Sequence, residues 1–162
     1  MAEIIVRKAV REDCKALMVL VQELATYQRM PNALKIDYKT LEKDGFGEKP
    51  LFFCYVATYD KNLIGYAFCS YTYSPWTGRS IFMEDLYVAS DFRQKNVGSK
   101  ILQAVAKDAL ENNCNKLDFP VLNWNSAQQF YKKLGASDLT IGEQWHRYRF
   151  ADEALKKLAS GK

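Results

Sequence analysis

The sequence lacks the long hydrophobic runs and the charge clusters that mark several classes of protein. No apolar stretch among its 162 residues approaches the ~20 residues needed to cross a bilayer. Its start has no basic segment followed by an apolar one, so no secretory signal is expected. The formal charge is only +4, and basic residues are scattered, whereas a nucleic-acid binder concentrates them. We therefore expect a cytoplasmic protein that binds neither membranes nor nucleic acid.

Cysteine and histidine are too few and too dispersed for a metal centre. The four cysteines occur in separate apolar segments and the only histidine is His146, so no group has the close spacing of zinc ligands. Free buried thiols are the simplest interpretation. One histidine without a nucleophilic serine or cysteine motif also argues against a hydrolase triad. We expect no metal, and any catalysis must use other side chains or the backbone.

The composition that remains is typical of one folded domain. Apolar residues make up 48% of the chain and charged residues 26%. Chains of roughly 100–200 residues usually form one domain, which buries about two-thirds of its extended surface. No linker, internal repeat or low-complexity tract interrupts the sequence. We therefore expect a single domain over residues 1–162.

Hydrophobic periodicity predicts an α/β (α+β) fold, with helices flanking one mixed sheet. Turn residues at 60–62 and 74–78 separate three β-like runs, which indicates an antiparallel meander. A short second helix is expected to end at Gly45 and Gly47 in the left-handed conformation. The predicted strands are 4–7, 51–59, 63–73, 80–88, 116–122 and 145–150. The predicted helices are 11–25, 38–42, 101–110, 126–134 and a short one capped by Asp152.

Residues 83–100 are the most informative segment. A strand leads through a short loop, which contains Arg93 and Lys95, directly into an amphipathic helix that starts near Gly98. Such a turn aims unpaired backbone N–H groups and the positive end of the helix dipole at one spot, where a diphosphate would fit. The segment lacks the glycines of a Walker or dinucleotide motif. From composition alone, an ordinary strand-to-helix connection is the alternative.

The loop sequence RQKNVG at residues 93–98 resembles the Arg/Gln-x-x-Gly-x-Gly/Ala acyl-CoA pyrophosphate loop of the GNAT N-acetyltransferases. Asn96 replaces the first glycine, and because asparagine tolerates positive φ, we expect the loop to keep its shape. Further segments resemble the spermidine/spermine and thialysine N-acetyltransferase branch of that family. They are 44–50, 75–79, 84–88 and 130–139.

This resemblance, which covers residues 4–158, implies the GNAT acyl-CoA N-acyltransferase fold and acetyl-CoA as co-substrate. Acetyl-CoA would enter where strands 80–88 and 116–122 separate. Because the segment from Asn125 to Tyr131 is one residue shorter than the family's spacing, Asn123 is an alternative to Asn125 as a CoA contact. The implied cofactor-binding residues are Leu86, Tyr87, Val88, Arg93, Gln94, Lys95, Asn96, Val97, Gly98, Ser99, Asn125, Ser126, Ala127 and Tyr131.

The implied chemistry depends on the protonation of the acceptor. A primary amine has a pKa near ~10 and must lose a proton before it attacks a thioester. By resemblance, Glu84 assists this loss directly or through water, and Tyr131 protonates the leaving thiolate as a general acid. A backbone N–H around Tyr87 would stabilise the oxyanion. Without the resemblance, Glu84 would be taken as a solvent-facing strand residue and Tyr131 as a helix residue packed on the sheet.

The substrate preference rests on which acids are missing. Gln28 and Ser74 stand where, by resemblance, the spermidine/spermine enzymes carry acids, so the attraction for a polycation is reduced. A thialysine-type amino acid, which carries its own carboxylate, suits a neutral Gln28 beside Arg29 better. Diamines and polyamines are expected as secondary substrates. The implied substrate-binding residues are Tyr27, Gln28, Trp76, Glu84, Asp85, Glu143 and Trp145.

Three alternatives remain open at this point. The protein could be a spermidine/spermine (diamine) N-acetyltransferase proper, or a catalytically silent CoA-binding interaction module. The least supported is a basic nucleic-acid binder, whose signature would be salt-dependent affinity for oligonucleotides. The resemblance also implies a homodimer, in which Tyr27, Gln28 or Glu143 would serve a neighbour's site.

Overall fold

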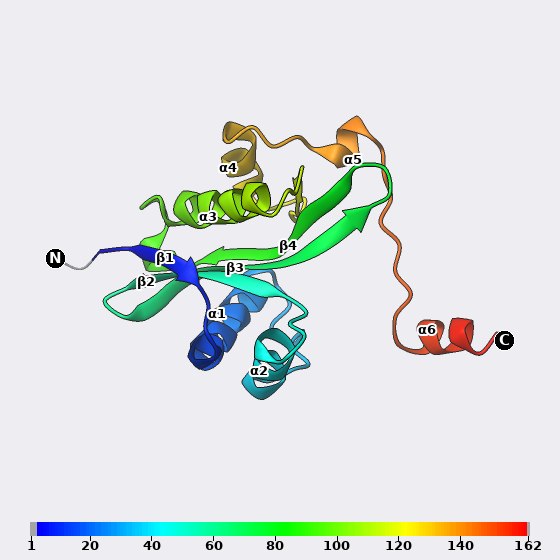
Figure 1. Ribbon diagram of the computed structural model, residues 1–162, viewed down its shortest axis with the longest axis horizontal. Helices are drawn as coiled ribbons and strands as arrows, with labels where there is room; N and C mark the ends of the chain where they lie inside the picture. Colours follow the sequence, from blue (N-terminus) through cyan, green and yellow to red (C-terminus); the bar gives the residue numbers. More distant parts are fainter. Residues whose placement is uncertain (1–2, 162) are drawn as a thin grey trace. The chain divides into compact units, whose positions relative to one another are not determined.

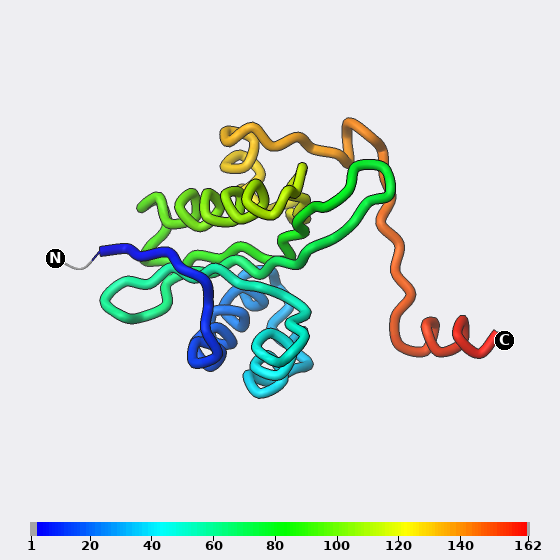
Figure 2. The backbone as a smooth tube through the Cα atoms, viewed as in Figure 1, coloured from blue at the N-terminus to red at the C-terminus, as the bar shows by residue number. Residues whose placement is uncertain are grey.

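The chain divides after Leu122 into two compact units, residues 1–122 and 123–162. The computed structural model, shown as a ribbon in Figure 1 and as a tube in Figure 2, describes residues 3–161. The strands are β1 (Ile5–Lys8), β2 (Phe53–Tyr59), β3 (Asn62–Ser74), β4 (Gly78–Val88) and β5 (Leu117–Asp118). The helices are η1 (Arg11–Asp13), α1 (Cys14–Tyr27), α2 (Tyr38–Phe46), η2 (Ser90–Phe92), α3 (Val97–Glu111), α4 (Ala127–Lys133), α5 (Leu139–Gly142) and α6 (Asp152–Ala159).

The first unit contains one five-stranded sheet in the order β1-β2-β3-β4-β5. The first three pairings are antiparallel and β4 pairs with β5 in parallel, which confirms the predicted mixed sheet. Strand β5 is shorter than the predicted 116–122. Pro120 comes soon after its end, and proline has no N–H to extend a ladder.

Helices cover both faces of this sheet (Figure 1): α1 and α2 lie on one face and α3 on the other. On the α1 face, Leu17, Leu20 and Leu24 are buried in one cluster with Val56 and Tyr66. On the α3 face, the absence of a side chain at Gly65 allows close packing. A Cβ at that position would lie 2.8 Å from the Tyr87 carbonyl oxygen and 3.2 Å from Cδ1 of Ile101.

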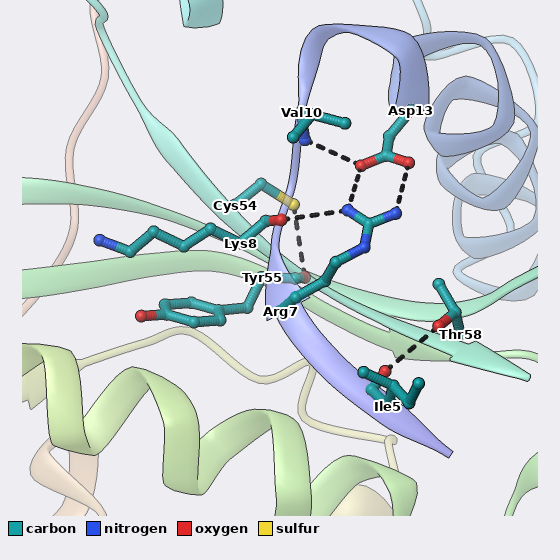
Figure 3. A network of polar contacts seen from close by, with 8 residues as sticks. All are labelled: Ile5, Arg7, Lys8, Val10, Asp13, Cys54, Tyr55 and Thr58. Atoms are coloured by element: carbon teal, nitrogen blue, oxygen red, sulfur yellow. Dashed lines mark hydrogen bonds and ion pairs between the residues drawn. The ribbon is translucent and has the colours of Figure 1, made fainter. Parts of the chain in front are cut away.

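An ion pair joins the end of β1 to the start of α1. Figure 3 shows Arg7 donating to both carboxylate oxygens of Asp13, at 2.6 and 2.9 Å, while the Val10 N–H donates to the same group at 2.8 Å. Burial alone would raise the pKa of Asp13, but these hydrogen bonds outweigh it and lower the pKa. The connection between strand and helix is thereby held in one geometry.

A second buried carboxylate ties α3 to the sheet. Asp108 is only 2% exposed and accepts hydrogen bonds from the hydroxyls of Tyr55 (2.9 Å) and Tyr71 (2.5 Å). Lys8 pairs with it at 2.7 Å. Burial raises its pKa, but the bonds from Lys8, Tyr71 and Tyr55 prevail and lower it below the ordinary 3.8. One helix residue therefore contacts β1, β2 and β3.

Helix α2 ends near the predicted glycines, but neither of them ends it by adopting the left-handed conformation. Gly47 follows the helix with φ −84° and ψ −170°, an extended conformation and not the left-handed one. Gly45 lies inside the helix, where a Cβ would collide with the Phe52 ring. The glycine at position 45 is thus explained by close packing against an aromatic ring.

The second unit contains α4, α5 and α6. Gly135 follows α4 with φ +95°, as expected for a helix-terminating glycine. The predicted strand over 145–150 is wrong, because these residues form no regular element and are exposed. Their aromatic content favours a strand, but a strand forms only when another strand takes up its backbone groups. The cap of α6 is Ala151, with Asp152 the first helical residue.

Two further features of the described chain bear on its class. All four cysteines are free and buried, as predicted. Within residues 3–161 no helix combines the length and the apolar character needed to cross a membrane.

We expect Asp108→Ala to lower the free energy of unfolding by about 1–3 kcal/mol, because two tyrosine hydroxyls lose their acceptor. Urea denaturation measures this, and Glu111→Ala is the control, because its exposed pair with Lys107 contributes little. Since folding depresses the Asp108 pKa, its stabilisation is present above the unfolded pKa and is lost as pH falls below about 4. A wild-type advantage that persists unchanged at lower pH would contradict this account.

Candidate functional site

A β-bulge in β4 is the structural basis of the site. Cys69 of β3 pairs with Met83, whereas Phe68 pairs with Asp85, so Glu84 has no partner on β3. A bulge bends a strand and increases its twist. Strand β5 pairs with β4 only before this point, at Ile81 and Phe82. Beyond the bulge, therefore, β4 has an open edge.

The register shows which peptide groups that edge presents. The Ala89 N–H donates to the Ile64 carbonyl at 2.9 Å. Because antiparallel pairs alternate between bonded and non-bonded positions, Tyr87 is bonded to β3, and the N–H and C=O groups of Leu86 and Val88 point away from it. An oxyanion donor was expected around Tyr87, but the N–H of Tyr87 is used by β3, and the N–H groups that point away from β3 are those of Leu86 and Val88.

The bulge also places two carboxylates side by side. Met83 and Leu86 share a face because their partners, Cys69 and Ala67, are two residues apart. Glu84 and Asp85 both lie between them. Glu84 is exposed and Asp85 is half-buried opposite Phe68. Burial, and secondarily the charge of Glu84, raises the pKa of Asp85 to about 6.

The predicted pyrophosphate loop contains two left-handed residues, Gln94 (φ 60°) and Asn96 (φ 62°). Asparagine thus has a positive φ at the position where the motif has glycine. Asn96 caps α3, and its carbonyl accepts from the Lys100 N–H at 3.1 Å. The preceding N–H groups of the first turn, at residues 97–99, have no helical carbonyl to bind. They can receive an anion at the positive end of the helix dipole.

Arg93 begins this loop and joins three predicted site residues. Its Nε donates to the Val88 carbonyl at 3.0 Å. Its guanidinium lies over the rings of Tyr27 and Tyr87, with 5.0 and 5.5 Å to the ring centroids. The Tyr87 hydroxyl donates to Glu23 Oε2 at 3.1 Å. The end of α1 is thereby brought to the loop.

The predicted residues of the second unit have their own local contacts. Asn125 accepts from the Ala127 N–H at 2.9 Å and so holds the start of α4, whereas Asn123 contributes its carbonyl, which accepts from the Gln128 side chain at 2.8 Å. Tyr131 is buried, and burial raises its pKa to about 12. The exposed Trp145 ring N–H donates to Glu143 at 2.7 Å.

The three remaining positions, Ser74, Trp76 and Gln28, lie at or just beyond the ends of elements of the first unit. Trp76 is 86% exposed at the β3–β4 turn. The Ser74 hydroxyl accepts from the backbone N–H groups of Trp76 and Thr77, at 3.2 and 3.4 Å. Gln28 lies directly after α1, where its N–H donates to the Leu24 carbonyl at 2.8 Å. Ser74 therefore shapes a turn, and Gln28 is held at the end of α1.

Two residues near the open edge escaped the sequence analysis. Tyr66 is fully buried and its hydroxyl has no hydrogen-bond partner within residues 3–161. Its hydroxyl interacts electrostatically with Asp85, although burial is the main cause of its raised pKa. Glu23 is the acceptor of Tyr87. The sequence held one signal for Glu23: it lies four residues before Tyr27, so the two share one face of the helix.

The comparison with family models decides the class. The model described as "Acetyltransferase (GNAT) family" matches residues 20–136. The chain belongs to the GNAT acetyltransferase family. It is accordingly an acetyl-CoA-dependent N-acetyltransferase, as the loop motif predicted. The matched region includes the bulge, the loop and Tyr131.

Two curated proteins with similar sequences are also acetyltransferases by name. The thialysine N-epsilon-acetyltransferase of Sus scrofa is 40% identical, in an alignment that covers 98% of this chain and 99% of that protein. The spermidine/spermine N(1)-acetyltransferase-like protein 1 of Homo sapiens is 34% identical over 95% of this chain, but the alignment covers only 23% of that protein.

Solved structures agree with the fold. An integron cassette protein from V. cholerae has a TM-score of 0.79 at 26% identity, covering 96% of this chain and 97% of that one. An aminoglycoside N-acetyltransferase in complex with CoA has a TM-score of 0.74 at 17% identity, covering 94% and 96%. The latter shows the fold alone, which confirms the predicted GNAT architecture.

We expect Asn96→Gly to change neither stability nor CoA affinity appreciably, whereas Asn96→Val should destabilise by about 1–2 kcal/mol, because a β-branched residue resists the left-handed conformation. CoA affinity should fall with it. Thermal unfolding and calorimetric titration with CoA measure the two effects. Equal behaviour of the two variants would show that the loop does not depend on this backbone conformation.

Proposed function

We propose that the protein acetylates the side-chain amine of thialysine-type amino acids, with diamines and polyamines as secondary substrates. The observation that carries this proposal is the 40% identity to a thialysine N-epsilon-acetyltransferase over nearly the full length of both chains. The family match spans the junction between the two units, which supports treating residues 1–162 as one acetyltransferase domain.

The acetyl-CoA-binding site that we propose consists of the open edge of β4 and the loop at residues 93–99. The outward peptide groups of Leu86 and Val88 suit the amide-bearing pantetheine arm. The left-handed residues Gln94 and Asn96, with the N–H groups of Val97, Gly98 and Ser99, suit its diphosphate. Bound acetyl-CoA supplies the thioester acetyl group. Arg93, Lys95, Asn125, Ser126 and Ala127 complete the proposed contacts.

The acceptor amine, in this proposal, is attracted by the carboxylates of Glu84 and Asp85. Glu84 is the exposed member and can accept the ammonium proton directly or through an intermediate water. Asp85 is half-buried, so its charge acts in a medium that screens it less than water does. An ammonium group between them relieves their mutual repulsion.

Tyr131 is proposed as the general acid. Its pKa of about 12 keeps the phenol protonated at neutral pH, so it holds a proton that it can give to the leaving thiolate. The N–H of Leu86 or Val88 would stabilise the oxyanion. In this proposal the Tyr131 phenol holds the proton for the thiolate, and the N–H of Leu86 or Val88 points away from β3 toward the open edge.

Preference for thialysine over polyamines rests on Gln28 and Ser74. Both are neutral, and Ser74 is engaged by the β3–β4 turn. Arg29 is the next residue after Gln28 and favours a substrate that carries a carboxylate. We assign Tyr27, Trp76, Glu143 and Trp145 to the acceptor side as well, on the resemblance alone.

A spermidine/spermine N-acetyltransferase proper is the alternative, supported by the 34% identical human relative. We also propose a cytoplasmic homodimer, in which the ends of α1 and α5 serve a neighbouring copy. Light scattering in solution tests the dimer independently of the chemistry.

Release of CoA thiol with thialysine, lysine, putrescine and spermidine, compared side by side, tests the substrate. We expect thialysine to have the highest kcat/KM. Spermidine ahead by tenfold, about 1.4 kcal/mol in transition-state binding, would assign the protein to the polyamine branch. Transfer to none of these amines, with CoA binding intact, would favour a silent CoA-binding module.

Tyr131→Phe should lower kcat by about 100-fold or more, because the proton donor is lost while ring packing is kept. Tyr148→Phe is the matched control, since Tyr148 is 88% exposed in the same unit and has no assigned role. If both variants retain wild-type kcat, Tyr131 is not the acid.

The pKa of Asp85 sets an acid limb in the pH profile. Below about pH 6 the carboxyl gains a proton and loses its attraction for the ammonium group, so kcat/KM for the amine should fall there. Asp85→Asn should have a lower kcat/KM and should lack this limb. A limb that survives unchanged in Asp85→Asn would assign it to another group.

A further inference from the structure

We propose that Glu23 is a positioning residue for acetyl-CoA, acting through the side chains of Tyr87 and Arg93. This inference rests on the proposed function, because it assumes that the loop at residues 93–99 binds the diphosphate of acetyl-CoA. Glu23 lies on α1, far in sequence from the loop, and it belongs to none of the groups assigned above.

The contact chain begins at the carboxylate. The Tyr87 hydroxyl gives its one proton to Glu23 Oε2, at 3.1 Å. The phenol oxygen then has only lone pairs to offer on its other side. Arg93 is the cation there, and its interaction lowers the Tyr87 pKa against the larger raising effects of burial and of Glu23. The acceptor on α1 therefore sets which way Tyr87 presents its oxygen.

Arg93 is held at three points, one of which is the Tyr87 side chain that Glu23 orients. Its guanidinium lies 5.5 Å from the Tyr87 ring centroid and 5.0 Å from that of Tyr27. Its Nε donates to the Val88 carbonyl at 3.0 Å. A planar guanidinium that is stacked and hydrogen-bonded loses the rotamer freedom that arginine otherwise has. The first residue of the loop is thus fixed before a ligand binds.

A fixed Arg93 also constrains the next residues of the loop. Gln94 and Asn96 occupy left-handed conformations. Asparagine tolerates this conformation, whereas glutamine adopts it only when its surroundings impose it. Arg93 itself is extended, at φ −67° and ψ 157°. An anchored start is one such constraint, and the cap of α3 is the other.

Glu23 acts through Tyr87 and not by pairing with the arginine. Within residues 3–161 no ion pair joins Glu23 to Arg93. A carboxylate near a diphosphate site would by charge alone disfavour the anion. Its benefit must therefore come from the hydrogen bond, so a substitution that removes the acceptor should reduce activity far more than one that keeps it.

The test compares two acetyl donors in Glu23→Met and Glu23→Gln. Acetyl-CoA carries the diphosphate, whereas S-acetylpantetheine lacks it. Glu23→Met should lower kcat/KM for acetyl-CoA about 5- to 20-fold, mainly through KM. This is at or below the lower end of the effect of losing one hydrogen bond to a charged group, because Glu23 acts indirectly through Tyr87 and Arg93. Its kcat/KM for S-acetylpantetheine should stay within about twofold. Glu23→Gln keeps an acceptor oxygen and should retain most of the acetyl-CoA activity.

Tyr87→Phe supplies the second arm. It removes the same hydrogen bond from the other side, so it should reproduce Glu23→Met, and the double variant should be no worse than either. Glu111→Met is the control, because it removes an exposed carboxylate at the far end of α3. That variant should behave as wild type with both donors.

Three results would overturn the proposal: equal losses with both donors in Glu23→Met, no loss with either, or additive losses in the double variant. Calorimetric titration of wild type and Glu23→Met with CoA and with pantetheine measures the same difference without turnover. The quantity to compare is the ratio of the Kd values of the two proteins for each ligand. If wild-type protein binds CoA but acetylates no amine, the proposed function fails while this ratio still decides the role of Glu23.

Discussion

The bulge at Glu84 is the constraint on which the rest of the site depends. One unpaired residue in β4 bends the strand, and beyond Phe82 β4 pairs with β3 but not with β5. Peptide groups of Leu86 and Val88 then face an open edge in place of β5. Because β5 ends at Asp118, these groups are not used in a ladder with β5.

The same bulge decides where the charges lie. It brings Glu84 and Asp85 together and turns Asp85 toward the face of Phe68 and Tyr66. Their unequal exposure separates their properties, since burial acts on Asp85 and water reaches Glu84. Backbone geometry thus creates the electrostatic environment in which a cationic amine is favoured.

Packing around the loop is shared between elements far apart in sequence. Arg93 connects the open edge, through Val88, to the end of α1, through Tyr27. On the other side of the sheet, Asp108 holds α3 to three strands. The helix whose first turn faces the proposed diphosphate is therefore anchored to the sheet near its C-terminal end, and the start of the loop is anchored separately.

The sequence by itself determined the order of the strands and α-helices in residues 1–122, the meander, the buried cysteines and the loop motif, because periodicity and turn residues are local properties. Tertiary structure decided on which face of the sheet the side chains after Met83 lie. Strict alternation would place Asp85 on the same face as Met83, but the bulge places it on the opposite face. Tertiary structure also decided that 145–150 forms no strand, since pairing needs a partner. Glu23 is linked to Tyr87 only by the fold, because a hydrogen bond between residues 64 positions apart leaves no local pattern.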